Sequence, residues 1–76
     1  MKKSIYSEQY EALRDAITQA RKAAGLTQQQ LAKKLGKHQS FVAKYEIGER
    51  RLDMVEFMTI AKELGADPIK ILKKFQ

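Results

Sequence analysis

Four glycines divide the chain into short segments with apolar patterns, and the helix ends that they mark constrain the fold most. A helical apolar pattern stops at each of them: Gly25, Gly36, Gly48 and Gly65. Glycine adopts the left-handed conformation that ends a helix without a Cβ penalty. No stretch alternates apolar and polar residues as a strand would. The sequence therefore predicts an all-α protein with five helices, at roughly 7–24, 27–35, 39–47, 54–64 and 68–75.

Residues that favour the start of a helix lie shortly after three of these glycines. Thr27 and Gln30 have the spacing of a capping box, in which each side chain binds the other residue's backbone N–H. Asp53 and Glu56 repeat the same spacing. Asp67 precedes a proline, which is well tolerated in the first turn of a helix. The second and fourth helices are thus predicted from both ends, and the fifth is predicted from its start.

Apolar residues recur at helical spacing and indicate the core-facing side of four helices. The expected core residues are Tyr6, Tyr10, Leu13, Ile17, Ala20, Ala24, Leu26, Leu31, Ala32, Leu35, Met54, Phe57, Met58, Ala61, Leu64, Ile69, Leu72 and Phe75. Val55, Ile60 and Ile71 widen the apolar arcs of the last two helices. Such width fits either a self-association surface or a plain compact core.

The length of 76 residues limits the chain to one domain, which we expect to span 1–76 with 1–4 as a mobile arm. There is no cysteine, so disulfides and thiolate metal sites are excluded. The start "MKKSIYSEQY" lacks the apolar region of a signal peptide. No apolar run approaches the ~18 residues of a membrane span. We therefore expect a cytoplasmic protein without a membrane partner.

Positive charge gathers in the middle of the chain. Residues 21–51 contain eight of the fifteen lysines and arginines but only two of the nine acids, so they carry the whole net charge of +6. This distribution is typical of a surface that binds a polyanion. A solvated basic face without a partner would show the same charge.

The third predicted helix has two different sides. At about 100° per residue, Val42 and Tyr45 point one way. The opposite side carries amide, hydroxyl and ammonium groups around one small residue, on Gln39, Ser40, Ala43 and Lys44. A glutamine amide suits the paired donor and acceptor of an adenine edge, and a lysine can reach guanine or phosphate. This side is therefore predicted to enter a DNA major groove. Phe41 lies at the boundary, and we favour packing over contact with a thymine methyl.

Nothing in the sequence indicates an enzyme or a cofactor. There is no nucleophile beside a base, no metal-ligand spacing and no glycine-rich phosphate loop. The single histidine, His38, cannot form a metal cluster by itself.

The segment from Leu26 to Pro68 resembles the helix-turn-helix domain of the XRE/Cro family of bacterial and phage regulators. The similarity rests on "LTQQQLA", Gly36 in the turn, "QSFVAKYEIG" and "IAKELG". It implies a compact five-helix, lambda repressor-like fold whose second and third helices form the motif.

The resemblance also implies roles by position. Gln39, Ser40 and Lys44 match residues that read base edges. The predicted phosphate contacts are at the start of helix two, in the turn and in the loop after helix three: Thr27, Gln28, Lys37, His38, Arg50 and Arg51. Arg21 and Glu46 match a buried ion pair. His38 replaces the small capping hydroxyl common in the family, so its role is phosphate contact or none.

Two functions follow. The first is a sequence-specific transcription regulator, of the repressor type, that binds double-stranded DNA at a palindromic operator as a homodimer with helix 39–47 in the major groove. The second is an antitoxin or similar module whose main partner is another protein, held by the wide apolar surface of the last two helices.

Overall fold

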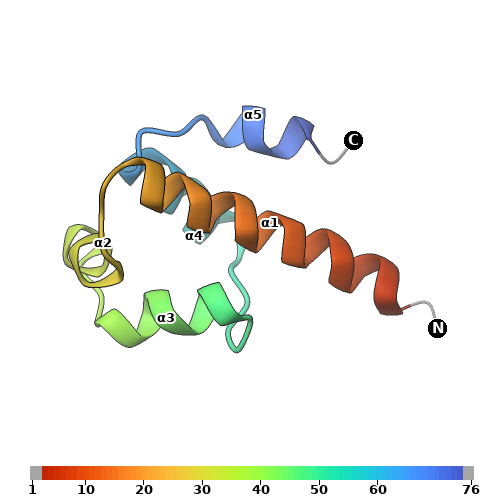
Figure 1. Cartoon of the computed structure of the whole chain (residues 1–76), viewed down its shortest axis with the longest axis horizontal. Helices are drawn as coiled ribbons and strands as arrows, with labels where there is room; N and C mark the ends of the chain where they lie inside the picture. Colours follow the sequence, from red (N-terminus) through yellow and green to blue (C-terminus); the bar gives the residue numbers. More distant parts are fainter. Residues whose placement is uncertain (1–2, 75–76) are drawn as a thin grey trace.

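The computed structural model describes the backbone of residues 3–74 and the side chains of residues 8–74. In this part of the chain there are five helices and no strand. They are α1 (Lys3–Ala23), α2 (Gln28–Leu35), α3 (Gln39–Ile47), α4 (Met54–Glu63) and α5 (Pro68–Lys73), arranged as Figure 1 shows. The all-α prediction is confirmed, and the predicted boundaries of α2 and α3 agree with the structure to within one residue.

Local hydrogen bonds account for these boundaries. Thr27 Oγ1 accepts a hydrogen bond from the Gln30 N–H at 3.0 Å, and Gln30 Oε1 accepts one from the Thr27 N–H at 2.9 Å. Asp53 and Glu56 form the same reciprocal pair at 2.7 and 2.9 Å. Both predicted capping boxes are therefore present, and they satisfy backbone donors that a helix start would otherwise leave unpaired.

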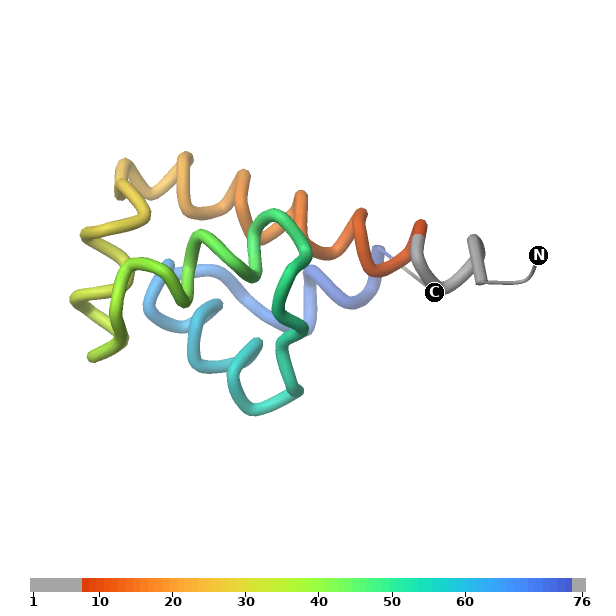
Figure 2. Tube along the Cα trace, turned by 90° about the horizontal axis from the view of Figure 1, so that it is seen from below, coloured from red at the N-terminus to blue at the C-terminus, as the bar shows by residue number. Residues whose placement is uncertain are grey.

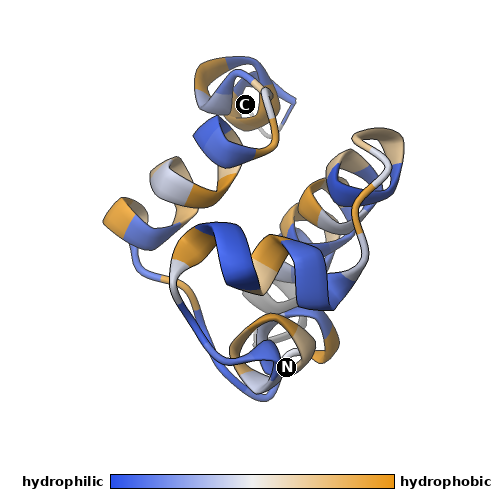
Figure 3. Cartoon of the chain, turned by 90° about the vertical axis from the view of Figure 1, so that its left-hand side faces the viewer, coloured by the Kyte–Doolittle hydropathy of each residue, from blue (hydrophilic) through white to orange (hydrophobic). Residues whose placement is uncertain are grey.

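The helices enclose one core. α2 packs against α3 and α4, while α1 contacts α3 and α5. In the view of Figure 2, from below, α3 lies in front with α1 along one side and α4 along the other. Hydrophilic and hydrophobic residues alternate along the helices in Figure 3, as expected of helices that bury one side. The largest fully buried side chains come from four helices: Tyr45, Ile17, Leu31, Ile60 and Val42.

The beginning of α1 differs from the sequence prediction. The helix starts at Lys3, four residues before the expected start, so residues 3 and 4 of the proposed arm are helical. Residues 1 and 2 of that arm lie outside the described residues, as do the side chains of Tyr6 and Phe75. In Figure 1 the N-terminal part of α1 extends past the end of α3. Tyr10 contacts the loop after α3.

The predicted inner faces of α4 and α5 were partly wrong. Met54 and Met58 are 58% and 41% exposed, and Ile69 is 57% exposed. Ile60 and Ile71, expected only to widen the apolar arcs, are buried. The helical spacing could not distinguish the buried apolar residues from the exposed ones, because apolar residues occupy more than one side of each helix. Ala24 is also exposed, because α1 ends at Ala23 and the chain turns there.

The end of α3 lies against Arg14 of α1. Gly48 follows the helix with φ +89°, and a Cβ added there would lie 3.0 Å from Arg14 Cζ. Arg14 Nη1 donates to the Glu46 carbonyl oxygen at 2.8 Å. That carbonyl belongs to the last turn of α3, where backbone acceptors lack helical partners. The backbone angle thus favours glycine, and a Cβ there would also press on the arginine beside it.

Replacing Gly48 by alanine is predicted to destabilise the fold more than the same change at Gly36. Both glycines end a helix in the left-handed conformation, but nothing lies within 4 Å of a Cβ at Gly36. Gly36→Ala should lower the free energy of unfolding by about 1–2 kcal/mol from backbone strain alone. Gly48→Ala should lower it further because Arg14 must move. Urea unfolding of both variants measures this, and equal losses would contradict the role of Arg14.

Candidate nucleic-acid interface

The two sides of α3 are separated as the sequence predicts. Val42 and Tyr45 are both 0% exposed. The polar residues Gln39, Ser40 and Lys44 are exposed, and Ala43 between them is half-buried. In Figure 2 none of the other helices lies in front of α3. The predicted base-reading residues therefore form an open surface on a helix whose other side is anchored in the core.

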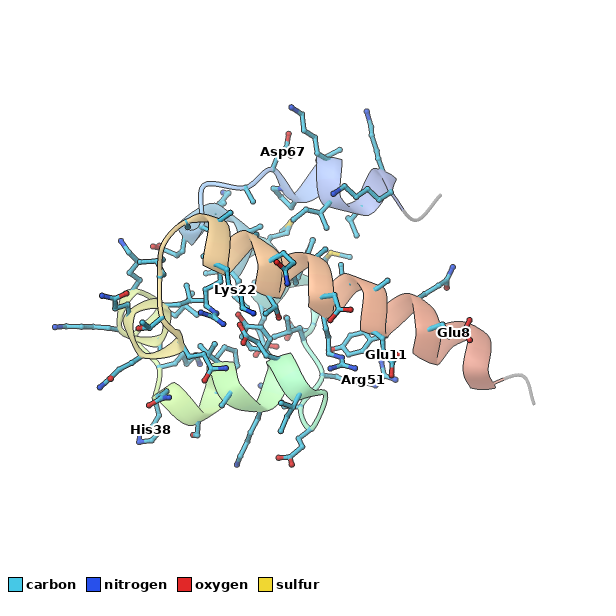
Figure 4. The ribbon with its side chains drawn as sticks, in the orientation of Figure 1. Glu8, Glu11, Lys22, His38, Arg51 and Asp67 are labelled. Atoms are coloured by element: carbon cyan, nitrogen blue, oxygen red, sulfur yellow. The ribbon has the colours of Figure 1, made fainter. Side chains whose placement is uncertain are left out.

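His38 has a structural role that the sequence analysis did not assign. Its Nδ1 accepts a hydrogen bond from the Ser40 N–H at 3.1 Å and also lies 3.1 Å from Ser40 Oγ. The imidazole thus caps α3 in place of the usual hydroxyl or carboxylate. The residue remains exposed at the beginning of the helix, as Figure 4 shows. A cap and a phosphate contact are compatible, because among the described residues only Nδ1 of the ring makes a hydrogen bond.

A buried ion pair ties α3 to α1. Arg21 Nε donates to Glu46 Oε2 at 2.8 Å, and Arg21 Nη2 donates to Oε1 at 3.2 Å. The side chains are only 11% and 6% exposed. Arg21 Nη1 also donates to the Leu26 carbonyl at 2.7 Å, and Gln28 Nε2 donates to Glu46 Oε1 at 2.8 Å. The pair implied by the family resemblance is present, and it connects α1, α2 and α3.

The network has a consequence for Gln28, which was predicted to contact phosphate. One of its amide donors is directed to Glu46, and the side chain is half-buried. Thr27, by comparison, is exposed at the start of α2. Gln28 is therefore less available to a phosphate than the sequence suggested. Next to the network, burial raises the pKa of the Tyr45 hydroxyl, and the neighbouring Glu46 carboxylate raises it further.

Arg50 is bound within the protein. Its Nη1 and Nη2 donate to the two carboxylate oxygens of Glu56 at 3.0 and 2.9 Å. The hydrogen bond from Arg50 lowers the pKa of the Glu56 carboxyl. The Arg50 guanidinium also lies 4.8 Å from the ring centroid of Phe41. Arg50 therefore connects the loop after α3 to α4. Its guanidinium is less available to a phosphate than the sequence suggested.

Arg51 differs from its neighbour. It is exposed, and within the described residues its guanidinium forms no ion pair. It lies 4.6 Å from the ring centroid of Tyr10 on α1. In Figure 4 Arg51 lies beyond the end of α3 opposite to His38. Two predicted phosphate contacts thus flank the exposed surface of α3 at its two ends.

Phe41 packs at the edge of the core, as favoured from the sequence. It is half-buried, and its ring meets the ring of Tyr45 edge-on, with centroids 5.5 Å apart. Lys37 Nζ lies 5.4 Å from the Phe41 centroid and is exposed. The Phe41 ring therefore makes cation–π contacts with two side chains, Lys37 in the turn and Arg50 in the loop.

Tyr10 and Arg14 were not predicted to take part in this region. Tyr10 was assigned only to the core, yet its Oη accepts a hydrogen bond from the Leu52 N–H at 3.0 Å. Arg14 received no role, although it binds the end of α3. No sequence signal identifies these contacts, since they join residues 42 and 32 positions apart.

Comparison with known proteins agrees with this geometry. A family model described as helix-turn-helix matches residues 17–71. The structure is similar to that of an XRE-family like protein from Pseudomonas syringae pv. tomato str. DC3000, with a TM-score of 0.91 and 50% sequence identity over 95% of this chain and 88% of that chain. The chain belongs to the XRE family of helix-turn-helix proteins. No curated protein matches it significantly.

Membership of the XRE family makes this chain a DNA-binding helix-turn-helix regulator, and the family is not one of enzymes. In the XRE fold, α2 and α3 are the two helices of the motif. The described part of the chain contains no helix long and apolar enough to cross a membrane. It also contains no group of three or more metal-ligating side chains.

Loss of one partner of the buried ion pair is predicted to be costly. Arg21→Met leaves Glu46 charged and without its main partner, which should lower the free energy of unfolding by about 3–5 kcal/mol. The double variant Arg21→Met/Glu46→Leu should recover much of this loss, because no unpaired charge remains. Urea unfolding measures both. A double variant less stable than Arg21→Met alone would show that the charge is not the cause.

Proposed function

We propose that this XRE-family domain regulates transcription by reading operator DNA with the outer side of α3. The observation that carries the proposal is the open polar surface of α3, backed by a buried core and flanked by basic residues. Gln39, Ser40 and Lys44 would contact base edges, and Ala43 would let the helix approach them closely. The net charge of +6 on residues 21–51 supports a polyanionic partner.

Phosphate contacts would hold α3 in register. Lys37, His38 and Arg51 are exposed near the two ends of the helix, and Thr27 is exposed at the start of α2. The free N–H groups at that helix start also favour an anion. Arg50 and Gln28 would make weaker phosphate contacts, because each is already bound to a carboxylate of this chain. Such contacts add affinity without sequence preference.

Substitutions at the two kinds of position should have different effects. Gln39→Ala should cost about 1–3 kcal/mol of binding to the preferred sequence and relax the preference at one base position. Arg51→Ala should weaken binding to all sequences alike and reduce the dependence on salt, as should Lys37→Ala. Binding curves on preferred and random duplexes at several salt concentrations separate the two. If Gln39→Ala weakened both duplexes equally, base reading by α3 would be wrong.

A homodimer is part of the proposal. Four large apolar side chains on α4 and α5 are exposed: Met54, Val55, Met58 and Ile69, at 58%, 67%, 41% and 57%. Exposed apolar side chains of this size are a common mark of association. In a symmetric pair the same surface of both subunits would form the interface, and each subunit would offer one α3 to the DNA.

The dimer makes two linked predictions. Selection from random DNA should yield a palindrome whose half-sites lie about 34 Å apart, one helical turn. Met58→Glu should shift the protein to the mass of a monomer in sedimentation experiments and weaken binding to the full palindrome. Gln19→Glu, which adds the same charge at an exposed position of α1, is the matched control and should change neither. A monomer-sized wild-type chain on an asymmetric site would contradict the dimer.

The same apolar residues are the observation that favours the second function, a module that holds another protein, such as an antitoxin. In that case a different protein would cover Met54, Val55 and Met58, and DNA binding would be secondary. Sedimentation and salt-dependent binding of the isolated chain distinguish the two functions. Tight, salt-sensitive binding by a dimer supports the regulator.

A further inference from the structure

We propose that Tyr10 is a positioning residue for DNA binding, which holds the loop between α3 and α4 so that Arg51 meets the DNA backbone. This inference rests on the proposed function, in which Arg51 is a phosphate contact. It assigns a specific purpose to the long N-terminal part of α1, which reaches past α3 to this loop.

The first support is a hydrogen bond to the loop backbone. Tyr10 Oη accepts the Leu52 N–H at 3.0 Å. Leu52 follows Arg51 directly and packs against the hydrophobic core with its side chain. The loop is therefore held from two directions at the residue after the arginine, so the backbone that carries Arg51 has a defined position.

The second support is the stacking of Arg51 on the same tyrosine. The guanidinium lies 4.6 Å from the ring centroid, within the range of a cation–π contact. An exposed arginine has many rotamers, and ordering it on binding costs up to about 2 kcal/mol. A ring that already restricts the side chain reduces this cost. Stacking leaves the N–H groups at the edge of the guanidinium available to a phosphate.

The third support is the second contact between α1 and the end of α3. Arg14 lies one turn after Tyr10, binds the Glu46 carbonyl and is 5.9 Å from the Tyr10 ring centroid. Glu11 Oε2 lies 3.7 Å from Arg14 Nη2. One side of α1 thus holds both the last turn of α3 and the loop that follows. Together with the bond from Arg50 to Glu56 on α4, this side of α1 fixes where Arg51 lies relative to α3.

A double-mutant cycle tests the inference. The wild-type chain, Tyr10→Leu, Arg51→Ala and the double variant are titrated with one preferred duplex at several salt concentrations. Tyr10→Leu should weaken binding on the order of fivefold, the effect of a single cation–π contact, and should lower the salt slope toward that of Arg51→Ala. In the Arg51→Ala background, Tyr10→Leu should have no further effect. Base preference should be unchanged in all four.

Two further variants make the result specific. Tyr10→Phe keeps the ring and removes the hydroxyl, so it should retain the stacking and lose about twofold in affinity. Gln9→Ala changes the exposed neighbour on α1 and should bind as the wild type does. Urea unfolding of each variant confirms that it is folded under the conditions of the titration. If Tyr10→Leu does not fold, Tyr10→Phe and its double variant with Arg51→Ala complete the cycle.

The outcomes separate this inference from the proposed function. Equal losses from the tyrosine substitution in both backgrounds, or no loss in either, would overturn the role of Tyr10 while DNA binding by the wild type stands. Absence of salt-sensitive DNA binding by the wild-type chain would overturn the proposed function, and the role of Tyr10 with it. A loss that disappears in the Arg51→Ala background supports the inference.

Discussion

The buried pair of Arg21 and Glu46 is the interaction on which the arrangement of the first three helices depends. It joins α1 to α3, and through Gln28 it includes the start of α2. Two charges that are nearly removed from water are tolerated only when each is matched by the other and by further hydrogen bonds. The geometry is therefore restrictive, because a shift of α3 along α1 would leave a carboxylate unpaired. A pair of this kind holds the helix at a defined place rather than adding much stability.

A helix of nine residues is too short to be stable by itself, so α3 depends on its surroundings. Val42 and Tyr45 bury one side of it. His38 satisfies a backbone donor at its beginning, and Arg14 satisfies an acceptor in its last turn. Of the outer-side residues, only the Ser40 hydroxyl lies within hydrogen-bond distance of one of these groups, the Nδ1 of His38. The polar residues proposed to read bases are thus carried on a helix that is fixed behind and at both ends.

Net charge alone described the basic region too simply. Arg50 and Arg51 are adjacent in the sequence and were expected to act together. In the structure Arg50 is taken by Glu56, which also caps α4, whereas Arg51 rests on an aromatic ring and stays exposed. The division follows from where α4 begins and where α1 extends. Arg50 therefore connects the loop to α4, whereas Arg51 remains on the surface.

The sequence by itself determined the helices and the split of α3 into a buried and an exposed side. These features depend on residues a few positions apart, such as Thr27 and Gln30, or Val42 and Tyr45, whose relation is set by the helical repeat. Only the tertiary structure decided which apolar sides of α4 and α5 face the core, because each offers more than one. It also decided that Tyr10 binds the Leu52 N–H, since no local rule relates residues 42 positions apart. Contacts over such distances form only after the helices have packed, and packing depends on the shape of the whole core.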